Sequence, residues 1–128
     1  IILSNDGEFI YKITHPKYEV EKTYNVTLKG QITDEEVEKL KNGVQIEDYI
    51  TGKAKVKILR IDKEKSLSRV EIIIHEGKNR EVRKMCEAIG RKVLALHRTK
   101  IGNISVKDLR LGTWRYLKPN EIKSLLDI

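Results

Sequence analysis

Two neighbouring segments with alternating apolar and charged residues set the first limit on how this chain folds. In Lys53–Ile58, lysines alternate with alanine, valine and isoleucine, and in Leu67–His75 three β-branched residues point to one side. A period of two is typical of strands with one buried face. The polar stretch Asp62–Ser66 between them has the length of a hairpin loop. The pattern therefore predicts an antiparallel β-hairpin.

The rest of the chain carries further strand and helix signals. Alternation over Val20–Leu28 predicts another half-buried strand. Thr33 followed three residues later by Glu36 is a capping box and predicts a helix start. Apolar residues at helical spacing predict a helix over Asn79–Ile89. Shorter elements are expected as a strand end at Ile1–Ser4, a helix over Glu8–Thr14, a strand over Val93–His97, a turn at Gly102–Asn103 and a last helix near Pro119.

This order of elements predicts an α+β fold, with a mixed, mostly antiparallel sheet and flanking helices. The 128 residues correspond to one domain or one large piece of a domain. Because the chain starts at Ile1 without a methionine, we expect it to be part of something longer.

The charge of the chain favours anionic partners. Its 26 Lys and Arg residues exceed its 19 Asp and Glu residues, which gives a net charge of +7. Most of this excess lies in residues 75–100. Nucleic acid or a phosphorylated ligand fits such a balance. The alternative is a soluble domain with solvated lysines, and charge alone does not separate the two.

Several classes of protein and site are not expected. No apolar run approaches the roughly eighteen residues of a membrane span, and no secretory signal is visible. Cys86 is the single cysteine, and the three histidines are far apart, so no disulfide or metal site is predicted. Neither common nucleotide-binding loop is present.

The basic stretch contains the first candidate site residues. Lys78 and Asn79 follow a glycine directly before the predicted helix, where free amides and the helix dipole attract anions. Arg83 borders the apolar stripe of that helix, and its planar guanidinium suits a carboxylate at the edge of the sheet. The alternative is a surface arginine paired with Glu76 or Glu87, which spacing alone favours.

The strand over Val20–Leu28 adds two further candidates. Tyr24 belongs to the apolar face of this strand, so core packing is its default role. Lys22 lies on the same face, where a lysine needs a carboxylate, a phosphate or an exposed strand end. This pattern indicates a ligand-facing end of the sheet with Tyr24 as its aromatic floor.

Six short strings, in this order, resemble the RsuA-type ribosomal RNA pseudouridine synthases over essentially the whole chain. Each string is weak alone, and their shared order is the signal. They are Ile2-Leu3-Ser4-Asn5-Asp6-Gly7, Thr14-His15-Pro16, Glu21-Lys22-Thr23-Tyr24, Glu76-Gly77-Lys78-Asn79-Arg80-Glu81-Val82-Arg83-Lys84-Met85, Leu96-His97-Arg98-Thr99-Lys100-Ile101-Gly102 and Leu111-Gly112-Thr113-Trp114-Arg115.

The resemblance implies isomerisation of a uridine in ribosomal RNA to its C-glycoside, with neither metal nor organic cofactor. By position, Tyr24 matches the tyrosine that stacks on the target base, and Arg83 matches the arginine that pairs with the nucleophilic aspartate. That aspartate is expected upstream of Ile1, so residues 1–128 are expected to be the C-terminal part of one catalytic domain and inactive alone. RNA contacts are expected from Lys22, Lys78, Asn79, Arg80 and Arg98.

Two other functions stay open at this point. One is a non-catalytic RNA-binding module that uses the basic face of residues 75–100, and the other is a basic scaffold domain without RNA. Within the resemblance, the asparagine–arginine pair at Asn79 and Arg80 is more similar to enzymes acting on large-subunit 23S RNA. A cytoplasmic monomer without membrane contact is expected.

Overall fold

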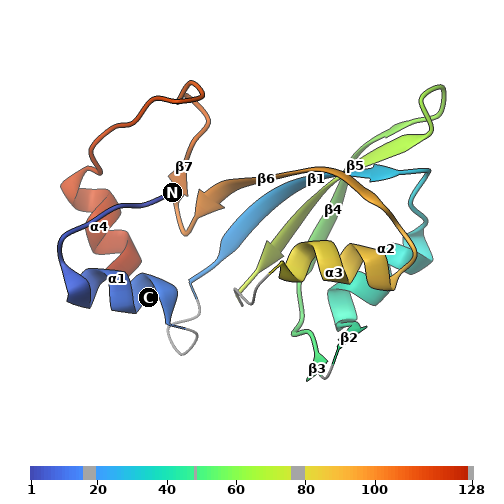
Figure 1. Ribbon diagram of the computed structural model, residues 1–128, viewed down its shortest axis with the longest axis horizontal. Coiled ribbons are helices and arrows are strands. Elements are labelled where there is room, and N and C mark those ends of the chain that lie inside the picture. The colour runs from blue at the N-terminus through green and yellow to red at the C-terminus, as the bar shows by residue number, and fades with distance from the viewer. Residues whose placement is uncertain (16–19, 48, 76–79, 127–128) are drawn as a thin grey trace.

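Helices and strands follow one another in a computed structural model that describes residues 1–15, 20–47, 49–75 and 80–126 (Figure 1). The predicted α+β fold is confirmed. In chain order the elements are α1 (Gly7–Thr14), β1 (Lys22–Lys29), α2 (Asp34–Asn42), β2 (Gln45–Ile46), β3 (Tyr49–Ile50), β4 (Lys55–Asp62), β5 (Leu67–Ile74), α3 (Glu81–Ala88), β6 (Val93–Ile101), β7 (Ile104–Ser105) and α4 (Pro119–Leu126).

The strands form a five-stranded sheet in the order β4-β5-β1-β6-β7, and each pair of neighbours is antiparallel. The short strands β2 and β3 pair separately. Figure 1 shows α2 and α3 on the same side of the sheet at one end, and α1 and α4 together beside β7 at the other end. The curved strands β1 and β6 connect these two halves of the molecule.

Local signals explain where two helices begin. In α1, the Asp6 carboxylate accepts hydrogen bonds from the amides of Glu8 and Phe9 at 3.1 and 3.2 Å. In α2, the predicted capping box is confirmed, because Thr33 and Glu36 exchange side-chain to backbone hydrogen bonds. Such caps satisfy amides that the first helical turn leaves without a partner.

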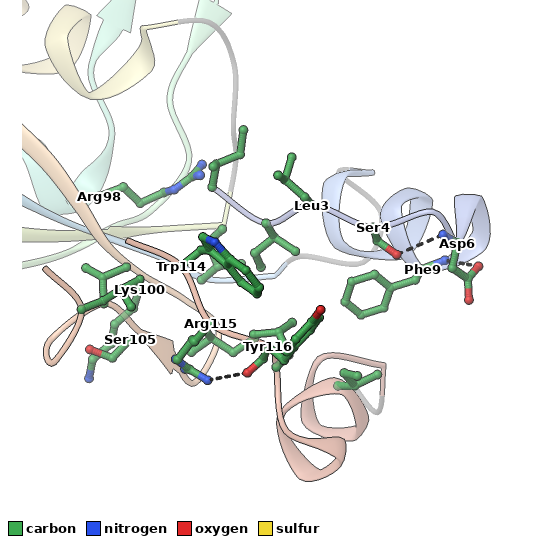
Figure 2. A pocket seen from close by; sticks show the side chains of 18 of the residues that line it. Leu3, Ser4, Asp6, Phe9, Arg98, Lys100, Ser105, Trp114, Arg115 and Tyr116 are labelled. Carbon is green, nitrogen blue, oxygen red and sulfur yellow. Dashed lines mark hydrogen bonds between the residues drawn. The ribbon is translucent and has the colours of Figure 1, made fainter. Parts of the chain in front are cut away.

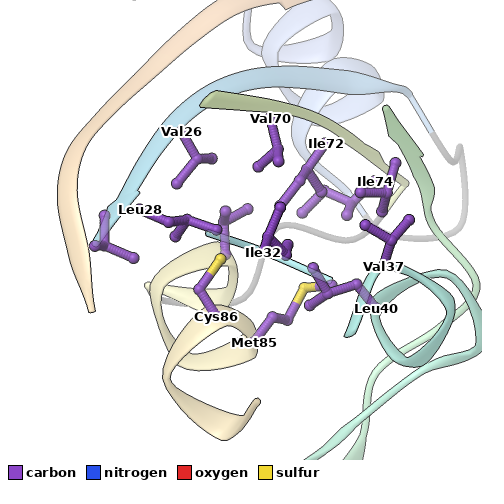
Figure 3. Close-up of a cluster of buried hydrophobic side chains, with 13 residues drawn as sticks. Val26, Leu28, Ile32, Val37, Leu40, Val70, Ile72, Ile74, Met85 and Cys86 are labelled. Atoms are coloured by element: carbon purple, nitrogen blue, oxygen red, sulfur yellow. The ribbon is translucent and has the colours of Figure 1, made fainter. Parts of the chain in front are cut away.

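The larger core cluster lies between the sheet and the helices α2 and α3 (Figure 3). Val26, Leu28, Val70 and Ile72 point from the sheet toward Met85 and the other helical side chains. The strand residues that alternate toward this side of the sheet form one wall of the cluster, and the helix residues at helical spacing form the other. Its buried members in the described ranges are Val26, Leu28, Ile32, Val37, Leu40, Val56, Val70, Ile72, Ile74, Val82, Met85, Cys86 and Val93.

The second cluster is smaller and lies at the other end, where α1 and α4 meet. Ile2, Ile10, Ile101 and Leu117 pack against it from its edges. We call these two halves the sheet–helix half, built around the larger cluster, and the α1–α4 half. The buried members of the smaller cluster in the described ranges are Phe9, Ile13, Val20, Ile104 and Leu125.

Three details differ from the sequence predictions. The expected strand end at Ile1–Ser4 is wrong: these residues pair with no described strand, and Ile2 packs instead against the smaller cluster. The strand predicted over Val93–His97 continues to Ile101, because β1 pairs with it over that length. The strands β2, β3 and β7 were not predicted, since pieces of two residues show no periodicity.

Among the described residues, no helix has the length and apolar character needed to span a membrane.

Candidate functional site

Lys22 and Tyr24 lie on the face of β1 that α2 and α3 cover. Alternation places both on the same side of the strand as the buried Val26 and Leu28. Tyr24 is half-buried and packs at the edge of the larger cluster. The default packing role is therefore present, while part of the residue stays accessible to another molecule.

A β-bulge between β1 and β6 brings Arg98 opposite Tyr24. Thr23 is the register partner of Lys100, whereas the next residue, Tyr24, is the partner of Arg98, so Thr99 is an extra residue in β6. The Thr99 hydroxyl donates a hydrogen bond to the Thr23 carbonyl at 3.3 Å. Because partners across an antiparallel pair share a face, Arg98 lies beside the tyrosine on the helix-covered side.

Lys22 is a half-buried lysine close to both a cation and an anion. Its Nζ donates a hydrogen bond to the Val20 carbonyl at 3.3 Å. Burial lowers the pKa of Lys22 below its usual value, the positive charge of Arg98 lowers it further, and the negative charge of Glu81 opposes both effects. Lys22, Arg98 and Glu81 therefore interact electrostatically although they come from β1, β6 and α3.

Arg83 lies in α3, next to the buried Val82, and is itself half-buried. No carboxylate of the described residues lies within 4.0 Å of its guanidinium, so the expected alternative pairing with Glu87 is absent. The other expected partner, Glu76, lies outside the described residues. Tyr24 packs against the larger cluster from the sheet, and Arg83 directly follows Val82, a helix residue of the same cluster.

The residues before α3 are only partly described. Arg80 is exposed and is the N-cap residue of the helix, with a left-handed backbone (φ 55°, ψ 28°) and no side-chain cap. A non-glycine residue in this region is uncommon, and such conformations concentrate at functional sites. Lys78 and Asn79, the other candidates in this segment, lie outside the described residues.

Sequence reasoning missed Glu81, which is buried at 2% exposure at the first position of α3. Its Oε1 accepts a hydrogen bond from the Tyr49 hydroxyl of β3 at 3.2 Å. Three residues further along α3, Lys84 forms an ion pair with Glu47 at 2.8 Å. A signal was present in the sequence, because Glu81 lies one helical turn before the buried Met85, on the edge of the apolar stripe.

A cavity of about 780 Å³ lies in the α1–α4 half (Figure 2). Apolar side chains from the N-terminal segment, β6, β7 and α4 form most of its wall, and Trp114 and Tyr116 meet edge to face there with ring centroids 5.1 Å apart. Arg98 reaches this cavity, whereas Tyr24 and Arg83 do not line it. Of the predicted site residues that the structure describes, Arg98 alone lines the cavity.

Other reactive groups are poorly placed for chemistry. Burial raises the pKa of the Cys86 thiol to about 12, with Glu87 adding to the effect, so this thiol is protonated at neutral pH and is a weak nucleophile. Among the described residues, no three His, Cys, Asp or Glu side chains come together as metal ligands.

Comparison with known proteins decides the family. A sequence profile described as RNA pseudouridylate synthase matches residues 1–88. The chain belongs to this family. The resemblance seen in the six sequence strings is thereby confirmed, and the matched residues include β1, α3 and every buried member of the larger cluster except Val93.

Relatives of the chain include synthases named for both ribosomal subunits. Ribosomal large subunit pseudouridine synthase B of Bacillus subtilis (strain 168) is 44% identical over 125 residues, which are 98% of this chain and 51% of the relative. Ribosomal small subunit pseudouridine synthase A of Vibrio vulnificus (strain CMCP6) is 38% identical over 128 residues, 98% of this chain and 53% of the relative.

The fold is also shared with a solved member of the family. A crystal structure of a pseudouridylate synthase superimposes with a TM-score of 0.86 at 34% sequence identity, over 95% of this chain and 52% of that chain. The chain thus spans about half the length of the relatives and of the solved structure that it matches.

Proposed function

We propose that the protein carrying this chain converts a uridine in ribosomal RNA to pseudouridine. In that reaction the bond between N1 of uracil and C1′ of ribose breaks, and a bond between C5 and C1′ forms. The observation that carries the proposal is the family match over residues 1–88, which includes Tyr24 and Arg83. We further propose that residues 1–128 are the C-terminal part of the catalytic domain.

Tyr24 supplies a stacking surface for the target base. Its ring is half-buried at the edge of the larger cluster, so one side is held by packing while the rest is accessible. Stacking of a base on an aromatic ring contributes about 1–3 kcal/mol to binding. A ring fixed by its neighbours loses little conformational freedom when a base stacks on it.

Arg83 binds and orients the carboxylate of the nucleophilic aspartate. It is half-buried and has no carboxylate partner among the described residues, so its guanidinium is available for such a pair. A paired arginine keeps a carboxylate charged in a closed site, where it attacks the base or C1′ of the sugar. If the pair is buried, removing Arg83 costs about 3–5 kcal/mol, because the carboxylate loses its counter-ion.

The cations around Tyr24 contact the RNA backbone and base edges. Lys22 and Arg98 share its face of the sheet, and Arg80 is exposed at the start of α3. Lys78 and Asn79 complete the proposed set by sequence position. Arginine suits bidentate phosphate contacts, and lysine acts as a point charge.

Large-subunit ribosomal RNA is the proposed substrate. The support is the similarity to the Bacillus subtilis protein named as a large-subunit synthase, together with the asparagine–arginine pair before α3. We propose that the protein acts as a monomer in the cytoplasm, and the proposed ribosomal RNA substrate supports that location.

The decisive experiment compares Arg83→Ala with Arg69→Ala in the protein that carries this chain with the rest of its catalytic domain. Arg69 is exposed on β5 and pairs across the sheet with Thr27, on the face opposite Tyr24, so it is a matched control. Arg83→Ala should form no detectable pseudouridine in ribosomal RNA and keep most of its RNA affinity, and Arg69→Ala should keep its activity. Full activity of Arg83→Ala would exclude the proposed role.

A non-catalytic RNA-binding role is the second candidate, and the net charge of +7 favours it over a scaffold without RNA. Each neutralised phosphate should contribute roughly −0.9 on a duplex or −0.7 on single strands to the slope of the logarithm of affinity against the logarithm of salt concentration. Strong salt-dependent binding without pseudouridine formation by the longer protein would select this role. That residues 1–128 alone form no pseudouridine stays a prediction, checked by incubating them with ribosomal RNA.

A further inference from the structure

Polar side chains of the β2–β3 hairpin (residues 45–47 and 49–50) contact the first turn of α3. The Tyr49 hydroxyl donates a hydrogen bond of 3.2 Å to Oε1 of Glu81, the first residue of the helix. Three residues later, Nζ of Lys84 lies 2.8 Å from Oε1 of Glu47. The strand β2 also lies beside α3, so both contacts join elements that pack together (Figure 1). The hairpin is therefore a polar support for this helix.

The hairpin is itself held by hydrogen bonds at its base and between its strands. At the base, the Thr51 amide donates to the Val44 carbonyl at 2.9 Å, and the Val44 amide donates to the buried Thr51 hydroxyl at 2.9 Å. Between the strands, the Gln45 side-chain amide donates to the carbonyls of Glu47 and Tyr49 at 3.2 and 3.1 Å. The two side chains that contact α3 therefore extend from a backbone that is fixed in place.

Burial makes the hydrogen bond to Glu81 the more important of the two contacts. Glu81 is 2% exposed, whereas the side chains of Lys84 and Glu47 are 27% and 62% exposed. Removing a donor from a buried carboxylate is costly, while an exposed ion pair contributes little. The Tyr49 hydroxyl is therefore the hairpin group on which the position of α3 depends most.

Arg83 lies on the flank of α3 opposite to these contacts. At about 3.6 residues per turn, Glu81 and Lys84 fall on one side of the buried stripe of Val82 and Met85, and Arg83 falls on the other. Apolar packing is not directional, so the stripe holds the helix on the sheet but allows small rotations about the helix axis. Such a rotation moves both flanks at once. The contacts on the hairpin side therefore also set the position of Arg83.

We propose that Tyr49 and Glu81 are positioning residues whose hydrogen bond, with the ion pair of Glu47 and Lys84 beside it, fixes the rotation of α3 and so places Arg83 against the carboxylate that it orients. They act through Arg83 and supply no group to the reaction. The meaning of this support for catalysis rests on the proposed function, whereas the support of α3 by the hairpin is a property of this chain alone.

The main test compares Tyr49→Phe with Tyr116→Phe in the protein that carries this chain with the rest of its catalytic domain. Tyr49→Phe removes one hydroxyl and keeps the ring, and Tyr116→Phe does the same at an exposed tyrosine of the α1–α4 half. In Tyr49→Phe, hydrogen exchange of the α3 amides should be faster, while the amides of β4 and β5 should exchange as before. Neither set of amides should change in Tyr116→Phe.

Kinetics of pseudouridine formation show whether this support matters for the reaction. In Tyr49→Phe, kcat should fall about tenfold, because a small misplacement of an orienting group slows the chemical step. KM for the RNA should stay within about twofold, because no group that binds RNA is removed. A raised KM with an unchanged kcat would overturn the proposal, since it would mean that Tyr49 contacts the RNA. Both constants should be unchanged in Tyr116→Phe.

A charge exchange tests the ion pair at exposed positions, where folding is not at risk. Glu47→Lys places two cations side by side and should lower kcat in the same direction as Tyr49→Phe. Adding Lys84→Glu restores opposite charges in exchanged places, so kcat should recover. A double variant as slow as Glu47→Lys would overturn the part assigned to the ion pair.

The two measurements separate this inference from the proposed function. If α3 exchange is unchanged in Tyr49→Phe, the hairpin does not hold the helix and the proposal is wrong. If exchange is faster but kcat is unchanged, the positioning role is wrong and the proposed function stands, because the unmodified protein is active. If the unmodified protein forms no pseudouridine, the proposed function and the positioning role both fail, and faster exchange would show only that the hairpin supports α3.

Discussion

The sheet–helix half and the α1–α4 half of the molecule differ in how many apolar side chains they bury. In the sheet–helix half, thirteen buried residues of the described ranges form one cluster, with α2 and α3 covering the sheet. In the α1–α4 half, five buried residues form the cluster, and the cavity beside it has exposed aromatic rings at its wall. Trp114 is 73% exposed and Tyr116 is 84% exposed.

This difference separates the part that holds the fold from the part that is open to contacts. The strand β1 and the helix α3, which carry Tyr24 and Arg83, contribute Val26, Val82 and Met85 to the larger cluster, so dense packing fixes their backbones. The α1–α4 half buries less apolar surface and should open locally at lower free energy. Rigid support for the site is therefore expected from only one of the two halves.

The largest expected effect comes from truncating a leucine in each cluster. Leu40 and Leu125 are both almost fully buried, one in the larger and one in the smaller cluster. Leu40→Ala should lower the free energy of unfolding by about 4 kcal/mol, and Leu125→Ala by about 2 kcal/mol, because a small cluster collapses more readily around a cavity. Urea denaturation followed by circular dichroism measures both. A larger loss in Leu125→Ala would contradict the comparison.

A smaller effect is expected from the carboxylates that cap α2 and α4. Burial alone would raise the pKa of Glu36, but hydrogen bonds from Arg91 and Thr33 outweigh it, so the pKa lies below its usual value. The hydrogen bonds from Arg115 lower the pKa of Glu121 to about 2, and the Lys118 amide adds to the effect. Each carboxylate therefore stabilises the folded chain when it is ionised.

Glu36→Gln should lower the free energy of unfolding at neutral pH by about 1.5 kcal/mol, because it removes a hydrogen-bonded charge. This contribution is complete above pH 4.5, the ordinary carboxyl value, and is lost as the pH falls through the lower folded value. The stability of the variant and of the unmodified chain should therefore converge in acid, as urea denaturation at several pH values will test. A difference independent of pH would contradict the charged hydrogen bond.

In α4, the effect of the ionised carboxylate is tested by NMR titration of Glu121. Its carboxyl group should stay ionised down to a pH of about 2, and Glu121→Gln should increase hydrogen exchange of the α4 amides above that pH. The amides of β4 and β5 should be unaffected, because these strands belong to the sheet–helix half. Increased exchange in β5 would show that the two halves open together.

The smallest effect is expected at the exposed aromatic wall of the cavity. Trp114→Ser should change the free energy of unfolding by less than about 0.5 kcal/mol, because most of the ring is already in water. Thermal unfolding measures this change, and Phe9→Ala in the smaller cluster is the buried control in the same half. A large loss in Trp114→Ser would mean that the wall stabilises the fold.

The sequence predicted the parts of the fold that depend on local periodicity. The capping box at Thr33 and Glu36, the hairpin of β4 and β5, and the apolar stripe of α3 are all confirmed. The expected strand at Ile1–Ser4 was wrong, because a strand needs a partner and apolar character does not supply one. The strands β2 and β3 are too short to show a pattern.

The candidate site was predictable only in part, for a physical reason. Alternation placed Lys22 and Tyr24 on one face, but it could not place Arg98 beside them, because that depends on a bulge between strands far apart in the sequence. The helical spacing of Glu81 indicated its burial, but its hydrogen bond with Tyr49 depends on a separate hairpin that local periodicity does not place. The meeting of Tyr24 and Arg83 at one substrate stays a prediction.

The bulge at Thr99 makes the spacing of residues in β6 more important than their chemical nature. Substitutions along this strand leave the order of neighbours intact, whereas loss of a single paired residue between Ala95 and Arg98 would turn one end of the strand over, since side chains alternate between faces. Arg98 would then lie on the far side of the sheet from Tyr24, or the residues after it would leave the α1–α4 half. A library of variants should therefore tolerate many replacements between Ala95 and Lys100 and almost no deletions apart from that of Thr99, whose loss would only remove the bulge.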